Sequence, residues 1–422
     1  MIEELKKTFG TFNKHFKKWP NSIREENFKK FIELGFPNKR LEDWKFLDFN
    51  AIISKEFKNL KINLNKKDKF NFNKYIRSFD HNKIIFLNGV FNKSYFANEK
   101  KKQIICNSVK GFDERMRSTI HDKSNNSLNF LNNAFYLDGV HLTIDKGYQF
   151  NQPIVIYNIF NSNNKNNFFN QKIKINMGEN SKADVLIYTV NLGSNPIFLN
   201  VYNDFQISKN SFTKIYNLNE LGDKDLFYNF NNVDVMNSAI FENFMMSCSS
   251  QLFKHEVKCN LNARYASGFI NGAFLNNNQQ NNEIKTRIEH RDENTKSFQK
   301  IKSVLDKNSK FVFQGKIYVD SKAQHTDGYQ LSKSIILDKE SEFDSKPELE
   351  IYADDVKCSH GSTSGNLDED SIFYLMSRGL SRNEAKKLLI QGFLIDAIET
   401  ITNKEIKEYF FEKLKNKINE FK

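Results

Sequence analysis

The chain has 422 residues, enough to bury a large core and to form two or three structural units. Lys and Arg outnumber Asp and Glu by 63 to 51, and the net charge of +12 would suit nucleic acid or an acidic protein as a partner. The lysines are, however, scattered among Asn, Ile and Phe, which favours compositional bias as the origin of the charge. Four cysteines without a Cys-x-x-Cys pair argue against a disulfide framework and against a four-thiolate metal or cluster site within the chain.

The N-terminal region, residues 1–130, is predicted to be mostly helical. From Glu3 to Lys18, charged residues alternate with Leu and Phe at helical spacing, and Trp19-Pro20 ends this pattern. Ser22 and Glu25 form a capping box for a second helix that runs to Leu34. The other elements expected here are short strands over 83–90 and 103–106 and a helix over 112–133.

The middle of the chain changes character from about Gly139 to Asp354, where short alternating runs typical of strands replace helical spacing. Several of these runs end in a small polar turn that contains a serine. The turn serines lie 30, 27, 71 and 32 residues apart, a repeat near thirty with one gap of about twice that. This spacing favours a coil whose rungs stack into one core, although a β-sandwich with regular hairpins is the alternative. The serines are Ser181, Ser211, Ser238, Ser309 and Ser341.

The C-terminal region, residues 361–422, returns to helical patterns. A short helix from Asp368 to Arg378 is followed by Gly379, which suits a left-handed helix cap. Ser381 opens the next helix with a second capping box. Apolar residues on this helix extend beyond one face, so the helix is either buried or binds a partner. We predict that its partner-binding side chains are Leu388, Leu394 and Ile398.

A thiol and an imidazole lie two residues apart where the β-rich region ends. On a strand, Cys358 and His360 would project from the same face, within reach of one metal ion or one sulfur species. Lys357 and the neighbouring backbone are expected to favour the thiolate of Cys358. A Cys-x-His pair is by itself a weak signal, and a purely structural role is the alternative.

Other candidate sites give weaker signals. The sequence has no Gly-x-x-x-x-Gly-Lys-Ser/Thr phosphate loop, no Gly-x-Ser-x-Gly elbow and no His-Glu-x-x-His motif, so we do not expect ATP hydrolysis by this chain. We expect His255 to be an ordinary strand residue, whereas His290 and His325 would lie close to His360 if the coils stack. Asp354-Asp355 is expected to form a turn or helix cap between a strand and a helix, and metal binding is the alternative. The cysteines expected to be small buried residues are Cys248 and Cys259.

Three motifs surround the Cys358–His360 pair: Lys-Pro-x-Leu-x-Ile at 346–351, Ala-Asp-Asp-Val-x-Cys-x-His-Gly at 353–361 and Phe-Tyr-Leu-x-Ser-Arg-Gly at 373–379. They resemble the SufB/SufD family of iron–sulfur cluster assembly proteins, and its SufD branch more than its SufB branch. The resemblance spans nearly the whole chain and is densest from about 311 to 398. Further matches are Glu42–Lys45, Asn133–Phe135, Gly315–Ile317 and Gln330, and departures are Ser362, Ser364 and Asn366.

The resemblance implies a mainly β fold, in which a right-handed parallel β-helix over 131–360 lies between the helical regions 1–130 and 361–422. It implies a scaffold subunit without ATPase activity, which pairs with SufB through the β-helix and binds the ATPase SufC through its C-terminal helices. Cys358 and His360 would contact a transient iron–sulfur cluster or sulfur near SufB, with His360 the better candidate. No permanently bound cofactor is expected for this chain, and a reduced flavin is a candidate cofactor of the complex. In the absence of SufB, the chain would either form a homodimer or remain a monomer.

Two other functions fit parts of the sequence. A β-helix enzyme acting on polysaccharides would need clustered carboxylates and a basic residue in a groove, and the sequence shows no such cluster. A basic nucleic-acid-binding protein would show strongly salt-dependent binding. The N-terminal residues contain no apolar leader and no run of eighteen apolar residues occurs, so we expect a cytoplasmic protein without a membrane span.

Overall fold

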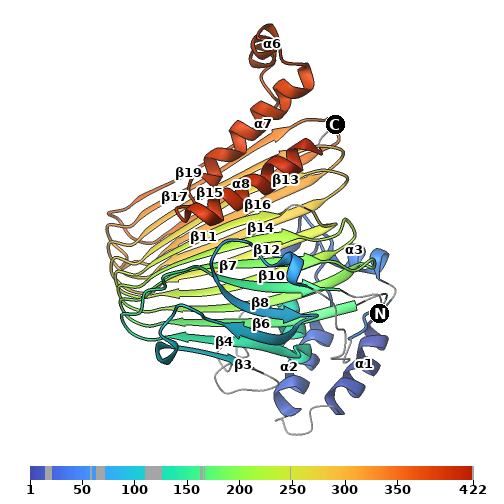
Figure 1. Ribbon diagram of the computed structural model, residues 1–422, viewed down its shortest axis with the longest axis vertical. Coiled ribbons are helices and arrows are strands. Elements are labelled where there is room, and N and C mark those ends of the chain that lie inside the picture. The colour runs from blue at the N-terminus through green and yellow to red at the C-terminus, as the bar shows by residue number, and fades with distance from the viewer. Residues whose placement is uncertain are drawn as a thin grey trace.

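The computed structural model describes residues 1–14, 21–57, 59–62, 72–109, 126–161, 165, 167–247 and 249–420. A parallel β-solenoid of about seven turns forms the body, and helices from both ends of the chain pack against it (Figure 1). The predicted stacked coil is therefore confirmed, and the β-sandwich alternative is wrong because neighbouring strands of the coil are parallel and come from successive turns.

Each turn of the solenoid contributes one strand to each of two sheets. From β4 onward the neighbouring strands in both sheets are parallel and in register. The ten-stranded sheet runs, within the described residues, in the order β19 (Lys357–Gly365), β17 (Asp327–Ile336), β15 (Lys296–Leu305), β13 (Ser267–Asn276), β11 (Ile240–Ser247), β9 (Phe212–Glu220), β7 (Lys182–Asn191), β5 (Ile154–Phe160), β1 (Asn82–Leu87) and β2 (Val90–Tyr95). The nine-stranded sheet, over the same part of the chain, runs in the order β18 (Glu342–Ile351), β16 (Lys310–Val319), β14 (Asn281–His290), β12 (Leu252–Leu261), β10 (Leu226–Val235), β8 (Ile197–Ile207), β6 (Asn167–Met177), β4 (Asp138–Ile144) and β3 (Ile104–Ser108).

The core of the solenoid lies between the two sheets. Because side chains alternate along a strand, every second residue faces inward, and most of these are Ile, Val, Leu or Phe. Ile288 and Ile317, for example, are register partners on β14 and β16 and are both fully buried. Rows of this kind run from coil to coil, so each turn completes the core of its neighbours and no coil is a separate unit.

The corners of the coil explain the turn residues in the sequence. At one corner a residue of each turn adopts a positive φ, and its N–H donates to a carbonyl of the following turn. Ser181, Ser211 and Ser238 lie at this corner, whereas Ser309 and Ser341 lie at the opposite one, between β15 and β16 and between β17 and β18. The gap of 71 residues therefore reflects a change of corner after two intervening turns, rather than a doubled repeat. The residues with positive φ at the first corner are Asn180, Asn210, Ser238, Tyr265, Asn294 and His325.

The N-terminal helices cover the outer face of the nine-stranded sheet, where their Phe and Leu side chains meet aromatic residues of β6, β8 and β10. The 3-10 helix η1 (Glu42–Trp44) is held by Lys254 of β12, whose ammonium lies over the Trp44 ring and pairs with the buried Glu283. The first two helices and the left-handed Gly35 follow the prediction, except that α2 already begins at Asn21, one residue before the predicted cap Ser22. Residues 15–20, with Trp19-Pro20, and residues 110–125 lie outside the described part. The helices are α1 (Ile2–Lys14), α2 (Asn21–Leu34), α3 (Phe49–Glu56) and α5 (Ser127–Phe135), with short 3-10 helices η2 (Asn73–Tyr75) and η3 (Lys101–Gln103).

The sheets extend beyond the expected range of 131–360 at both ends. β1 pairs in parallel with β5, and β3 pairs antiparallel with β4, so the sheets already begin at Asn82. β2 was not predicted; it forms a hairpin with β1 across Asn88 and Gly89, both of which have positive φ. At the other end β19 continues to Gly365. At the N-terminal end, β1 and β3 bond backbone groups of β5 and β4 that would otherwise lie at a sheet edge.

The C-terminal helices are α6 (Glu369–Ser377), α7 (Arg382–Ile398) and α8 (Lys404–Asn419). The predicted caps are present: Asp368 caps α6, Gly379 has a positive φ, and Ser381 forms the capping box of α7. α7 and α8 pack on the outer face of the ten-stranded sheet, and α6 stands away from it (Figure 1). Among the described residues, no helix is both long enough and apolar enough to cross a membrane.

Candidate functional site

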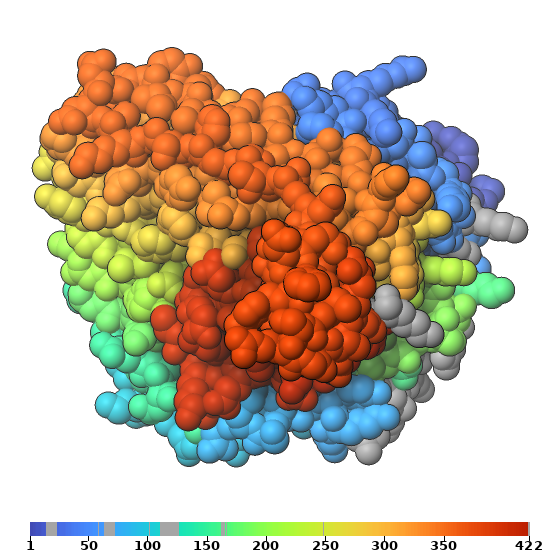
Figure 2. Space-filling model, turned by 90° about the horizontal axis from the view of Figure 1, so that it is seen from above, coloured from blue at the N-terminus to red at the C-terminus, as the bar shows by residue number. Residues whose placement is uncertain are grey.

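The C-terminal end of the solenoid is open. β18 and β19 are the outermost strands of their sheets and, within the described residues, each has a strand neighbour on one side only. Their residues are mostly half-buried or exposed, in contrast to the buried inner faces of β16 and β17. Figure 2 looks onto this end and shows the last turns, in orange, beside the red C-terminal helices. Such strand edges can pair with a strand of another chain.

The two strand edges differ in their ability to form hydrogen bonds. The N–H of Lys357 donates to Thr326 in the preceding turn, so by alternation the N–H groups of His360 and Ser362 point to the free edge of β19. On β18 the N–H of Glu342 donates back to Ser309, and Pro347 therefore occupies a position whose donor would point outward. Proline removes that donor without breaking the sheet, so the edge of β18 is interrupted and that of β19 is not.

Cys358 and His360 lie on the same, inner face of β19, as predicted. The thiol of Cys358 packs against the small cluster that includes Ile317 and Val319. Gly328 is its register partner on β17, and a Cβ at that position would lie 3.3 Å from the sulfur, so glycine leaves room for the thiol. His360 is exposed because no further turn covers it within the described chain.

The expected thiolate at Cys358 is not what the structure supports. Burial is the largest influence on this group and raises the pKa of the thiol, and the charge of Asp327 raises it further. The backbone N–H of Gly328 lowers the pKa, but by less. Lys357 projects to the opposite face of the strand, where it is exposed, and does not counter the burial. Burial therefore disfavours the thiolate of Cys358 in this chain.

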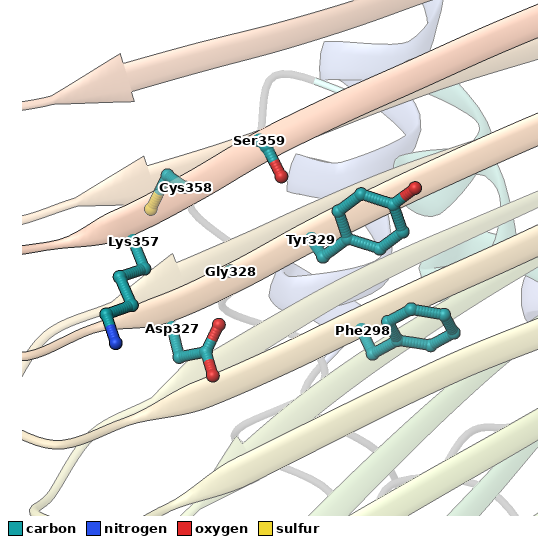
Figure 3. Close-up of a pocket in the computed structure, with 7 residues that line it drawn as sticks. All are labelled: Phe298, Asp327, Gly328, Tyr329, Lys357, Cys358 and Ser359. Atoms are coloured by element: carbon teal, nitrogen blue, oxygen red, sulfur yellow. The ribbon is translucent and has the colours of Figure 1, made fainter.

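A shallow pocket of about 420 Å³ lies next to Cys358 on the outer side of the ten-stranded sheet (Figure 3). Its floor is formed by the rings of Phe298 and Tyr329, which stack with centroids 5.3 Å apart. Ser359 continues this outward row on β19 (Figure 3). The Cys358 residue lines the pocket, but its sulfur packs inward, so the pocket lies beside the Cys358–His360 pair rather than around it. The complete lining is Phe298, Asp327, Gly328, Tyr329, Lys357, Cys358 and Ser359.

The other histidines have partners away from His360. His255 is buried inside the solenoid beside Asn229 and Asn231, and burial lowers its pKa to about 3. His290 is buried between Thr295 and Ser297, with its pKa also lowered by burial to about 3. The remaining three in the described residues are His325, at a corner, which pairs with Asp355 at 2.9 Å, His141, which bonds Thr143 and Asn176, and His81, which bonds the Tyr157 hydroxyl.

The other predicted site residues also have clear positions. Asp354 and Asp355 form a bend, as expected, but it lies between the strands β18 and β19 rather than between a strand and a helix. Cys259 is buried, as expected, whereas Cys248 lies outside the described residues. In the described part of the chain, no group of three or more His, Cys, Asp or Glu side chains lies close enough together to hold a metal ion.

The predicted partner-binding residues on α7 are only partly available. Leu388 is 47% exposed, but Leu394 and Ile398 are 0% and 1% exposed and pack against the solenoid, so they cannot bind a partner without unfolding this contact. The apolar excess of α7 is explained by burial at its C-terminal half.

Sequence analysis missed the apolar surface of α6. Phe373 is 73% exposed, and Tyr374 and Met376 are also exposed. The signal in the sequence was the pair of adjacent large aromatic residues on a helix of only nine residues. We call these three residues together with Leu388 the α6–α7 apolar face.

Comparisons with known proteins match the chain to one family over most of its length. A family model described as SUF system FeS cluster assembly, SufBD core domain, matches residues 159–393, and one described as SufBD protein N-terminal region matches residues 3–156. The iron-sulfur cluster assembly protein SufD of Escherichia coli (strain K12) is 22% identical over 393 residues, which cover 91% of this chain and 90% of that protein. An iron-sulfur cluster assembly SufBD family protein of Synechocystis sp. (strain ATCC 27184 / PCC 6803 / Kazusa) is 23% identical over 87% of this chain and 84% of its own length. The chloroplastic protein ABCI7 of Arabidopsis thaliana is 39% identical over 105 residues, which cover 25% of this chain and 22% of that protein.

Proposed function

Because the chain belongs to the SufBD family of SUF-system iron–sulfur cluster assembly proteins, we propose that it is a scaffold subunit without ATPase activity, on which nascent clusters are built. The observation that carries this proposal is the open end of the solenoid. There an unblocked strand edge and an exposed imidazole lie on the same strand, β19, with a thiol two residues away. The proposed cellular location of this cluster assembly is the cytoplasm.

The partner at the open end is a second solenoid of the same family, SufB. Two solenoids that each end in open sheets can join by pairing their edge strands, which gives hydrogen bonds along the backbone and a shared core. The free edge of β19 is the better edge for this contact, since Pro347 interrupts that of β18. A second copy of this chain could use the same edge when SufB is missing.

At this junction, His360 is proposed to contact the nascent cluster or its sulfur. A neutral imidazole is a good ligand for iron, and thiolates supplied by SufB would be the softer ligands. Splitting the ligands between two chains would let a movement at the interface release the cluster. Cys358 has the smaller role, because burial raises the pKa of its thiol. The cluster is cargo of the complex, and the reduced flavin implied by the resemblance would likewise belong to the complex.

The second partner is the ATPase SufC, which is proposed to bind the α6–α7 apolar face. Phe373, Tyr374, Met376 and Leu388 are large apolar side chains exposed on helices that extend beyond the solenoid (Figure 1). Several large apolar side chains left exposed on two neighbouring helices are typical of a protein interface. Closure of SufC on ATP would then move α6 and α7 and, through them, the junction with SufB.

Co-expression tests this proposal. Tagged chain, produced together with SufB and SufC, is expected to purify as a complex that hydrolyses ATP, whereas the chain alone is expected to show no ATP turnover. The alternatives give other results: a nucleic-acid-binding protein would retain DNA or RNA in a salt-dependent way, and a polysaccharide-acting enzyme would cleave its substrate without partners. ATP turnover by the rigorously purified chain would overturn the scaffold function.

A further inference from the structure

Inside the open end, the carboxamide of Gln330 lies next to His360. The two residues are register partners on β17 and β19, and both face the interior of the coil. Gln330 is completely buried, although the strand beside it is largely exposed. Its amide nitrogen donates to the carbonyl oxygen of Glu348 on β18, at 3.4 Å. Its amide oxygen is also buried and has no hydrogen-bond partner.

The orientation of this amide is fixed by its surroundings. The carbonyl of Glu348 can only accept, so the NH₂ group of Gln330 must face it and the oxygen must point away. Gly315, on the facing strand β16, provides the space, because a Cβ there would lie 2.3 Å from the oxygen. The chain thus places a buried acceptor at the end of the coil and keeps a side chain out of its way.

An acceptor buried in this way normally has a donor. Gln299, the register partner on β15, has a buried amide nitrogen without a partner, so it is one candidate donor. An amide oxygen carries two lone pairs, however, and can accept from Gln299 on one side and from His360 on the other. The imidazole is the neighbour toward the open end and carries one N–H when neutral.

We propose that Gln330 is a positioning residue for His360: its amide oxygen accepts the proton of one ring nitrogen and leaves the lone pair of the other nitrogen facing the open end. This inference rests on the proposed contact between His360 and the cluster, and it adds how the imidazole is held for it. A histidine that ligates a metal commonly donates its second ring nitrogen to an oxygen acceptor, which fixes the tautomer and the ring orientation.

The test compares Gln330→Leu with Gln299→Leu in the full-length chain. Both replacements remove a fully buried carboxamide from the same inward row, but only Gln330 is the register partner of His360. The chain is labelled with ¹⁵N-histidine, and the ring-nitrogen shifts of His360, assigned with His360→Gln, are measured near pH 8, where a free imidazole is neutral. We expect Gln330→Leu to change the tautomer populations of His360 and Gln299→Leu to leave them unchanged.

Unchanged ring-nitrogen shifts in Gln330→Leu would overturn the inference, and so would equal changes in both variants, which would indicate packing of the whole row. If Gln330→Leu does not fold, Gly315→Ala tests the same contact, because its Cβ would displace the amide oxygen. In the complex with SufB and SufC, Gln330→Leu is expected to weaken iron retention by about 10- to 100-fold. Normal iron content in His360→Ala would refute the cluster contact itself, while the tautomer measurement would still decide the hydrogen bond.

Discussion

Cys358 and His360 share one face of β19 but have different environments. The sulfur is half-buried above Gly328 and against Ile317, whereas the imidazole is exposed at the open end. The shared face follows from the two-residue spacing alone and was predictable. The state of the thiol was not, because it depends on burial against Ile317 and Val319, about forty positions away in sequence, which only the stacking of the coils brings close.

The raised pKa of Cys358 leads to a prediction about its reactivity. A raised pKa means a smaller thiolate fraction at pH 7, so alkylation of Cys358 should be slower than that of a free cysteine, whose pKa is about 8.5. The rate should rise with pH and reach half of its maximum above that value. The measurement is the difference in thiol modification between the wild-type chain and Cys358→Ser from pH 6 to 10. A midpoint at or below about 8.5 would show that the thiol is not buried as described.

At the scale of elements, the free edges of β18 and β19 differ in their capacity for hydrogen bonds because of one residue, Pro347. Pro347 was visible in the sequence, but its meaning depends on which N–H groups of β18 face outward, and this is fixed only by the register with β16. The same holds for α7: its apolar residues were recognised, but Leu394 and Ile398 are buried because α7 lies along the solenoid. The caps of α6 and α7, in contrast, depend on neighbouring residues only and were predicted correctly.

The free edge of β19 can be tested with a proline. Ser362→Pro removes an N–H that points outward and leaves the hydrogen bonds to β17 in place, while Ser362→Ala keeps the N–H and is the matched control. Loss of a backbone hydrogen bond at the interface should weaken pairing with SufB by about 1 kcal/mol or more, which is at least about fivefold. Pairing is measured by titration in solution. Equal affinity for the proline and alanine variants would place the SufB contact elsewhere.

Replacing an exposed apolar residue of the α6–α7 apolar face should have a different effect from replacing a buried residue of α7. Phe373→Asp should leave the unfolding midpoint unchanged and weaken SufC binding by about 2 kcal/mol or more, roughly thirtyfold. Leu394→Asp should instead destabilise the fold by about 3 kcal/mol or more, because it places a charge in the contact between α7 and the sheet. Pull-down with SufC and thermal unfolding are measured for both. Full SufC binding by folded Phe373→Asp would exclude this face.

At the scale of the whole molecule, alternation of polar and apolar residues and the repeat near thirty predicted the stacked coil, because both are local consequences of its geometry. The repeat did not reveal that the serine-containing turns lie at two different corners, since similar turns occur at both. It also did not reveal that residues before 131 join the sheets, since β1 and β3 find their partners only after folding. The open end is a property of the whole chain. It exists because the coil stops at β19 and the chain then leaves it as helices (Figure 1).

The central claim is that this open end contributes a ligand to the nascent cluster, and the iron and acid-labile sulfide of the purified complex test it most directly. His360→Ala, co-expressed with SufB and SufC, should assemble normally and hydrolyse ATP at the wild-type rate, since the imidazole is exposed. It should nevertheless retain much less iron and sulfide, and Cys358→Ala should retain more than His360→Ala. Wild-type iron and sulfide in a well-assembled His360→Ala complex would contradict the claim.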